Sequence, residues 1–249
     1  MAMTRIRRDP PPTPSQMEQH SCFNCQMRNR TEWCVLPQVA LSQLDDSKRV
    51  NTFSSGHVIY HQGDPVRGIY CIESGTVAIR KTDVHGNSIL LRLAHAGQTI
   101  GYRDFFGGEV FAASAETLTP TTLCHVDRDS LRNLLSHNPE LGLKFLSHIA
   151  KDLDTAEDAI LQHTSLSVRT RLAHLLLTLK DRYAGVNARG EIVISLPINR
   201  QDIAALLGTR PETIARTIHA LESDSVVSFS GRQVLVPDLS TLLNEIESN

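Results

Sequence analysis

The feature that most constrains the fold is a pair of short amphipathic segments near the C-terminus, joined by a turn of three residues. The first segment, residues 200–207 (RQDIAALL), places its apolar residues on one side of a helix. Gly208 follows where a helix commonly ends in a left-handed residue, and Pro211 stands where the next helix would begin. The pattern predicts two short helices that meet at a tight turn.

The second predicted helix runs from residue 211 to about residue 222. Residues 226–236 (VVSFSGRQVLV) follow as two β-runs around a Ser-Gly pair, which predicts a hairpin wing. Helix, turn, helix and wing together predict a winged helix-turn-helix, whose second helix can enter a DNA major groove. On that helix Glu212 and Arg216 lie one turn apart, and such side chains can read cytosine and guanine respectively.

A plain alternative for Glu212 and Arg216 is a surface ion pair worth about 0.3–0.5 kcal/mol. The surrounding motif favours base readout instead. Residues 167–232 carry nine Lys/Arg against six Asp/Glu, a net of +3 in a chain of formal net charge −2, so a basic surface suited to phosphate contact is local. The candidate DNA-contacting residues are Glu212, Thr213, Ala215, Arg216, Thr217, Arg200, Arg210 and Arg232.

The chain changes character between residues 51 and 126, where short apolar runs alternate with turn signals. Val, Ile and Thr alternate with polar residues, and Gly-Asp, Ser-Gly and His-Gly-Asn sequences separate the runs. This spacing predicts an antiparallel β-rich domain, either a barrel or a roll.

Residues 128–166 switch to a helical period, and their apolar residues form a narrow, uncharged stripe spaced three and four apart. Packing of this stripe against its own domain is one interpretation. A helix–helix dimer seam is favoured because the stripe is narrow and lies between two domains. The seam residues are Leu146, Ile149, Leu153, Ala156 and Ile160.

The first twenty residues hold four prolines and no apolar run, which predicts a mobile leader rather than a secretory signal. No stretch of about 18 apolar residues appears, so no membrane span and a cytoplasmic location are expected. The sequence contains neither a phosphate-binding loop nor a nucleophile elbow, so we do not expect an enzyme. The predicted divisions are a leader at 1–20, a cysteine segment plus β-domain at 21–127, a dimerisation helix at 128–166 and the winged helix-turn-helix at 167–249.

Three cysteines, Cys22, Cys25 and Cys34, fall within thirteen residues, in a chain that holds five. The C-x2-C spacing occurs in zinc and in iron–sulfur sites, and alone it is only moderately specific. Cys71 lies inside the apolar run IYCIESG, so we expect a buried strand thiol. Trp33 is expected either to cover the site beside Cys34 or to pack in the core. The residues alone leave open a metal site, a thiol redox switch or no metal.

The combination of the β-run GDPVRGIYCIESGTVAI, a long dimer helix and the C-terminal helix TRPETIAR resembles the Crp/Fnr superfamily of bacterial transcription regulators. The resemblance covers roughly residues 20–245. It implies an α+β fold with an N-terminal antiparallel β-roll like that of cyclic-nucleotide-binding domains, a long dimerisation helix and a C-terminal winged helix-turn-helix. It also implies double-stranded DNA, a second copy of the chain and RNA polymerase as partners, and a palindrome with TTGAT-like half-sites one helical turn apart. Ala215 stands where the Fnr branch commonly has Ser.

Members of this superfamily that bind cyclic AMP use a Gly-Glu pair and an Arg-Ser-Ala run in the roll. Aligned on its glycines and Ser-Ala, this chain has Tyr102 in place of the ribose-binding Glu and Ala113 in place of the phosphate-binding Arg. The loss of that Arg removes a bidentate pair with phosphate, so cyclic-nucleotide binding is not expected. Arg103 could in principle substitute for it.

The resemblance then points to the Fnr branch, whose members carry three N-terminal cysteines plus one at the end of the roll. Cys124 falls at that fourth position, so the resemblance implies a [4Fe–4S] cluster on Cys22, Cys25, Cys34 and Cys124. The eight residues between Cys25 and Cys34 exceed the gap of the best-known member, and a longer gap only enlarges a loop.

The mechanism implied by this resemblance is a sensor of oxygen or nitric oxide. Either gas would attack the cluster, release the tether between the N-terminal segment and the roll, and weaken DNA binding. Because the seam carries no charge, we expect the cluster-free protein to remain largely dimeric. Structural zinc, direct thiol oxidation or a small ligand in the roll are the alternatives within the same fold.

Overall fold

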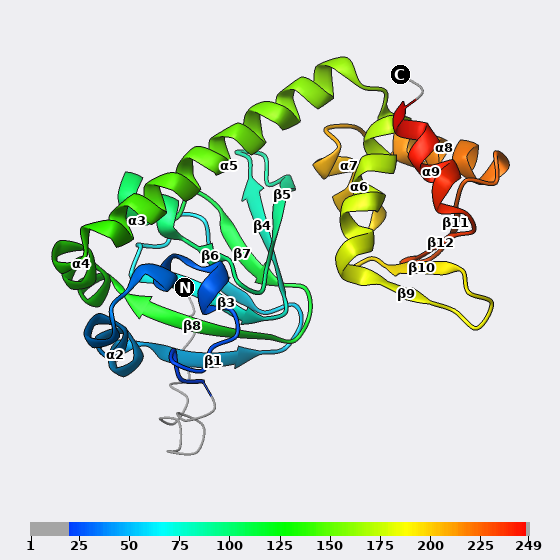
Figure 1. Cartoon of the computed structure of the whole chain (residues 1–249). Coiled ribbons are helices and arrows are strands. Elements are labelled where there is room, and N and C mark those ends of the chain that lie inside the picture. The colour runs from blue at the N-terminus through cyan, green and yellow to red at the C-terminus, as the bar shows by residue number, and fades with distance from the viewer. Residues whose placement is uncertain (1–19, 248–249) are drawn as a thin grey trace.

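Residues 20–247 are described by the structure, a computed structural model, in which two domains are joined by the long helix α5 (Pro139–Ser165) (Figure 1). The N-terminal domain is a β-roll of two four-stranded antiparallel sheets, with strand orders β1-β8-β3-β6 and β2-β7-β4-β5. The predicted roll is therefore confirmed. The mobile leader predicted at residues 1–20 lies outside the described residues, except for its last position.

Short strands and tight turns build the roll, as the alternating pattern predicts. Gly75 joins β3 to β4 with a φ of +94°, and a Cβ there would lie 2.6 Å from the carbonyl oxygen of Pro120. Only glycine suits this Ser-Gly turn. The strands are β1 (Arg49–Phe53), β2 (Val58–Tyr60), β3 (Gly68–Ser74), β4 (Thr76–Thr82), β5 (Ser88–His95), β6 (Thr99–Ile100), β7 (Ser114–Thr117) and β8 (Thr121–Asp127).

Helices close the roll on the side of the sheet β1-β8-β3-β6 (Figure 1). The inward strand residues share one core with helix side chains, among them the fully buried Leu44, Leu131, Leu141 and Phe145. A short helix after β6 was not predicted. The helical elements of this domain are η1 (Arg28–Arg30), η2 (Glu32–Val35), α2 (Gln38–Ser47), α3 (Tyr102–Gly107) and α4 (Arg128–His137).

The prediction of one continuous helix over 128–166 was wrong, because the segment holds two helices, α4 and α5. Pro139 lacks an N–H and disfavours helical geometry at the residue before it. Asn138 accordingly leaves the helical region (φ −135°, ψ 80°), and its Nδ2 donates to the carbonyl of Leu134. Pro139 then occupies the first turn of α5, a position that suits it.

The C-terminal domain is a helix-turn-helix with an antiparallel sheet of order β11-β12-β10-β9, as the sequence predicts for the helices and the wing. Gly208 in the turn has a φ of +59°, which confirms the left-handed end of the first helix. Strand β9 and the last helix carried no recognisable signal. The elements are α6 (Val168–Tyr183), β9 (Ala184–Val186), β10 (Ile192–Ser195), α7 (Arg200–Leu206), α8 (Pro211–Ser223), β11 (Ser228–Ser230), β12 (Gln233–Val236) and α9 (Leu239–Glu247).

The β4–β5 hairpin of the roll also packs against the C-terminal domain (Figure 1). Arg80 Nη1 lies 2.6 Å from Oδ1 of Asp202, a buried residue in the first turn of α7. The hydroxyls of Thr76 and Tyr183 are 2.8 Å apart across the same boundary. The roll therefore touches the helix-turn-helix directly, in addition to the link through α5. Among the described helices, none is long and apolar enough to cross a membrane.

Candidate functional site

Helix α8 presents the predicted DNA-reading face to solvent. Glu212, Ala215 and Arg216 are exposed, while Ile214 and Ile218 are buried in the domain core. Among the ion pairs of residues 20–247, none joins Glu212 to Arg216, so the ion-pair alternative is not seen. Both side chains are therefore available to base edges.

The two threonines of this face, Thr213 and Thr217, are less available for DNA contact than the sequence suggests. The Thr217 hydroxyl donates to the carbonyl of Thr213 at 2.9 Å, and both residues are half-buried. His219, which sequence reasoning did not single out, is exposed one turn beyond Arg216. Only its position on α8, and no motif, would have identified it.

The basic residues of this domain divide into structural and exposed groups. Arg171 is buried, and its Nη1 donates to the carbonyl of Leu207 at 2.6 Å, which supports the turn before α8. Arg169 pairs with Glu245 and Asp224. These two arginines therefore do not contribute to a phosphate-binding surface. The exposed candidates Arg200, Arg210 and Arg232 remain available for phosphate contact.

Four of the five cysteines line one cavity of about 30 Å³, which we call the cysteine cavity. It lies between the cysteine segment (residues 20–36) and the sheet β1-β8-β3-β6, and Cys22, Cys25, Cys71 and Cys124 contribute to its walls. Cys71 and Cys124 are direct partners in the register of β3 and β8. Cys34 is exposed on η2 and is not part of the wall. Three of the four predicted ligands are thus brought together.

Asp45 of helix α2 and Lys48, which directly follows that helix, hold Cys22 in place. The backbone N–H of Cys22 donates to Asp45 Oδ1 at 2.7 Å, and the Ser21 hydroxyl donates to Asp45 Oδ2 at 2.9 Å. Lys48 pairs with Asp45, and only 6% of its side chain is exposed. Burial works against the ammonium charge, but the Asp45 carboxylate keeps the pKa of Lys48 raised. The wall of the cavity therefore carries a charged ammonium, which is paired with the Asp45 carboxylate.

Two thiols of this cavity, those of Cys22 and Cys124, are protonated at neutral pH. Burial raises the pKa of Cys22 to about 11, although the ammonium of Lys48 works in the opposite direction. Burial, assisted by the Glu73 carboxylate, raises the pKa of Cys124 to about 12. Because a metal binds thiolates, loading these ligands would release protons.

The donor set suits a soft metal centre, but its present arrangement is too tight for a cluster. As the side chains lie, no three His, Cys, Asp or Glu residues within 20–247 could hold one metal ion. A cavity of about 30 Å³ has room for about two waters. Binding of a four-iron cluster would thus require the cysteine segment to move outward and Cys34 to turn inward.

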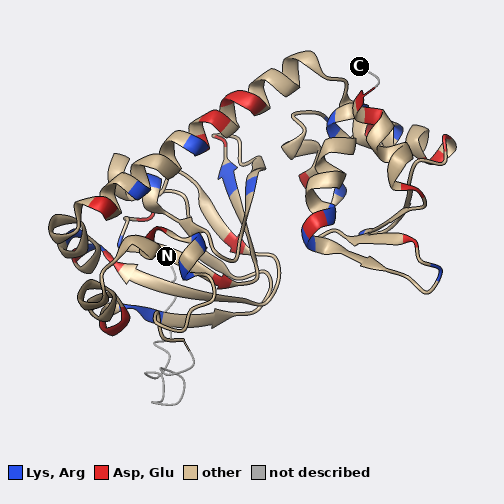
Figure 2. Ribbon diagram, viewed as in Figure 1, with Lys and Arg blue, Asp and Glu red and all other residues tan. Residues whose placement is uncertain are grey.

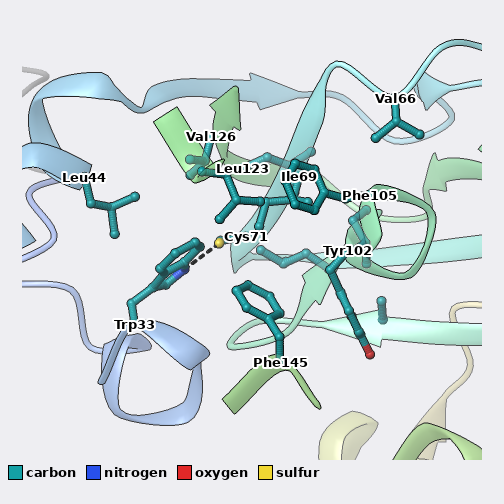
Figure 3. Close-up of a cluster of buried hydrophobic side chains, with 14 of the residues drawn as sticks. Trp33, Leu44, Val66, Ile69, Cys71, Tyr102, Phe105, Leu123, Val126 and Phe145 are labelled. Carbon is teal, nitrogen blue, oxygen red and sulfur yellow. Dashed lines mark hydrogen bonds between the residues drawn. The ribbon is translucent and has the colours of Figure 1, made fainter. Parts of the chain in front are cut away.

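Cys71 is the buried strand thiol that the sequence predicts, with 7% of the residue exposed. The indole Nε1–H of Trp33 donates to Cys71 Sγ at 2.7 Å (Figure 3). Trp33 also lines the cysteine cavity and is itself buried. The core-packing role expected for Trp33 is therefore confirmed, and whether it covers a metal site stays a prediction.

A second cavity, of about 50 Å³, lies in the roll where the superfamily resemblance places a cyclic nucleotide. Its lining includes Tyr102, Arg103 and Ala113, and also Arg92, which sequence reasoning did not single out. The Tyr102 hydroxyl donates to Asp152 Oδ2 of α5 at 2.6 Å. The residue that stands in place of the ribose-binding Glu therefore links the roll to α5.

The predicted seam lies largely free on α5. Leu146, Leu153 and Ile160 are 61%, 58% and 65% exposed, and Ala156 is exposed as well. Ile149 differs, because it is half-buried against the core of the roll. Charged side chains occupy other positions along the same helix (Figure 2).

Comparison with known proteins assigns both domains. Residues 50–138 match the family model described as cyclic nucleotide-binding domain, and residues 170–245 match that described as Crp-like helix-turn-helix domain. The chain is 25% identical to the transcriptional activator protein FnrL of Cereibacter sphaeroides, over 91% of this chain and 92% of that protein. It is 25% identical to the anaerobic regulatory protein of Haemophilus influenzae, over 91% and 89% respectively.

Relatives with a different named signal match as well. The chain is 26% identical to the CRP-like cAMP-activated global transcriptional regulator of Mycobacterium tuberculosis, over 82% of this chain and 90% of that protein. Among solved structures, a CRP/FNR family regulator from Thermus thermophilus has a TM-score of 0.68 and 25% identity, covering 80% of this chain and 98% of that one. FixK2 from Bradyrhizobium japonicum has a TM-score of 0.67 and 25% identity, covering 79% and 96%. The expected α+β architecture is thereby confirmed.

Proposed function

This chain belongs to the Crp/Fnr family of DNA-binding transcription regulators, and we propose that a [4Fe–4S] cluster sensitive to oxygen or nitric oxide controls its DNA affinity. The observation that carries the proposal is the convergence of Cys22 and Cys25 with Cys124, about a hundred residues away, on one cavity. Similarity to FnrL and to an anaerobic regulatory protein, over 91% of this chain in each case, supports the same branch of the family.

Cys22, Cys25, Cys34 and Cys124 would hold the cluster, which when bound would supply reactivity toward oxygen or nitric oxide. The side chains around these cysteines would supply the charge balance and the exclusion of water. Lys48 offsets the negative charge of the thiolates, and Trp33 shields one wall from water. Because Cys22 and Cys124 are protonated without a metal, loading is favoured as pH rises.

DNA recognition would use two copies of α8 in a homodimer. The exposed seam on α5 supports pairing of two chains, since its side chains are apolar and unusually uncovered. Two α8 helices related by a two-fold axis would read a TTGAT-like palindrome with half-sites about 34–36 Å apart, in a cytoplasmic complex with RNA polymerase. Arg216 would pair with guanine and Glu212 with cytosine, and the exposed arginines would contact phosphates.

The decisive experiment is iron and acid-labile sulfide analysis of protein purified without oxygen. We expect about four iron and four sulfide per chain, as the proposed cluster requires. Cys34→Ser should lose the cluster, whereas Cys71→Ser is the matched control, because Cys71 lines the same cavity outside the proposed set. Stoichiometric zinc, or no metal, would overturn the proposal. If Cys34→Ser keeps the cluster and Cys71→Ser loses it, the fourth ligand is Cys71 and not Cys34.

A second candidate function follows from the roll cavity. Arg92 and Arg103 line it together with one carboxylate, Asp104, and the excess of guanidinium groups favours a small anionic ligand. Such a ligand would act beside Tyr102, whose hydroxyl already bonds to Asp152 of α5. Equilibrium dialysis with inorganic phosphate and with cyclic AMP as probes decides this point. Saturable binding of either probe that is lost in Arg92→Gln would support this second function. The absence of binding at millimolar concentrations of both probes would rule it out.

A further inference from the structure

Glu32 is a carboxylate in a place where the sequence gives no reason to expect one. It is 1% exposed and lies on η2, within the cysteine segment, where it faces β6 and α5. Its Oε1 is 2.6 Å from Nδ1 of His148 on α5, and its Oε2 accepts a hydrogen bond from the Thr99 hydroxyl at 2.6 Å. A buried carboxylate without such partners is strongly unfavourable, so Glu32 and α5 are held together.

Trp33, the next residue, contacts both the cysteine cavity and α5. One part of the indole lines the cavity, where its Nε1–H bonds to Cys71 Sγ. The ring also packs edge-on against Phe145 of α5, with 5.8 Å between ring centroids (Figure 3). A change in the shape of the cavity therefore acts on a side chain that rests directly on α5.

The contacted residues of α5 lie on its roll-facing side. Phe145 is fully buried, and Tyr102 and Phe106 also pack against its ring. His148 follows three residues later on the same side. The exposed seam lies on other positions of this helix, so a shift at Phe145 and His148 would change how the seam is presented.

We propose that Glu32, Trp33, Phe145 and His148 form a latch, through which a displacement of the cysteine segment reaches α5. The latch deepens the proposed function, because it names the residues that would carry a signal from the cysteines toward the DNA-reading helices. Glu32 and Trp33 act as positioning residues for α5. They lie on η2 together with Cys34, so inward movement of that cysteine strains the latch directly.

The test perturbs the cavity in metal-free protein. Cys22→Phe introduces a ring that a cavity of about 30 Å³ does not accommodate. Trp33 is the only tryptophan of the chain, so its emission reports on the latch itself, and amide exchange of residues 141–152 reports on α5. We expect Cys22→Phe and Glu32→Gln each to shift the emission to longer wavelength and to speed the exchange at least fivefold. Glu140→Gln, an exposed carboxylate on α5, is the matched control and should change neither readout.

The double variant Cys22→Phe/Glu32→Gln distinguishes a latch from two separate defects. Through a latch the two effects do not add, so the double variant should exchange no faster than Glu32→Gln. Wild-type exchange in Cys22→Phe, or additive effects in the double variant, would overturn the proposal. Should Cys22→Phe fail to fold, Cys25→Phe on the same segment provides the same comparison. These emission and exchange measurements use metal-free protein, so they do not depend on a cluster. A wild-type protein purified without iron would therefore overturn the proposed function but would not change the result for the latch.

Discussion

The exposed fraction of the seam side chains sets how strongly a substitution in the seam should weaken the dimer. Full burial of an Ile or Leu side chain stabilises by about 1.5–3 kcal/mol. Because Ile160 is 65% exposed in the single chain, pairing would bury a side chain worth about 1–2 kcal/mol per copy, and about 2–4 kcal/mol for two copies in a two-fold dimer. Ile160→Ala removes most of this contribution and should raise the dimer Kd about 10- to 300-fold.

Leu161 provides the matched control for this variant. It is 63% exposed and adjacent in sequence, but it lies outside the spacing of the seam. Leu161→Ala should therefore change the dimer Kd less than about threefold, which corresponds to about 0.7 kcal/mol. Sedimentation equilibrium of metal-free protein from nanomolar to micromolar concentration measures both variants and the wild type.

Two outcomes would refute the reasoning behind the seam. Equal weakening by Ile160→Ala and Leu161→Ala would mean that the contact follows a different face of α5. A wild-type chain that is monomeric at micromolar concentration without metal would mean that an uncharged apolar seam is insufficient for pairing, contrary to the expectation stated for the cluster-free protein.

Three further predictions concern the fold. Arg80→Gln leaves the Asp202 carboxylate buried without its guanidinium and should lower the free energy of unfolding by about 2–4 kcal/mol in urea, while the exposed neighbour Lys81→Gln should have little effect; equal losses would contradict the pair. Gly208→Ala forces a left-handed residue (φ +59°) against the end of α5 and should cost about 1–2 kcal/mol, so an unchanged melting temperature would contradict the turn geometry. Burial, aided by nearby arginines, lowers the pKa of His95 to about 4, below an ordinary value near 6.5. The unfolded chain therefore binds the extra proton first, stability should fall from pH 6.5 toward pH 4, and His95→Gln should flatten this part of the melting profile; a variant with the wild-type profile would contradict it.

The helix-turn-helix was predictable because its signals are local. Gly208 ends one helix in a left-handed conformation and Pro211 begins the next, and each residue type has few alternatives at such positions. The break between α4 and α5 was missed for a related reason. Apolar spacing continues across Pro139, and a proline within a periodic run can start a helix as well as end one.

The cysteine cavity was only partly predictable. The pairing of Cys71 with Cys124 depends on the register of two strands distant in sequence, for which no local pattern exists. Lys48 and Glu32 look like ordinary surface charges in the sequence, yet both side chains are largely buried. Their burial follows from tertiary packing of the cysteine segment against α2 and α5, and periodicity does not report on such packing.

The central claim is tested most directly by the affinity of protein purified without oxygen for a palindromic duplex, measured at fixed salt concentration before and after exposure to air. Visible absorption recorded on the same samples follows the cluster. We predict that the affinity falls at least tenfold as the absorption is lost, and that Cys34→Ser begins at the air-exposed value. An affinity that stays unchanged while the absorption disappears would contradict control of DNA binding by the cysteine cavity.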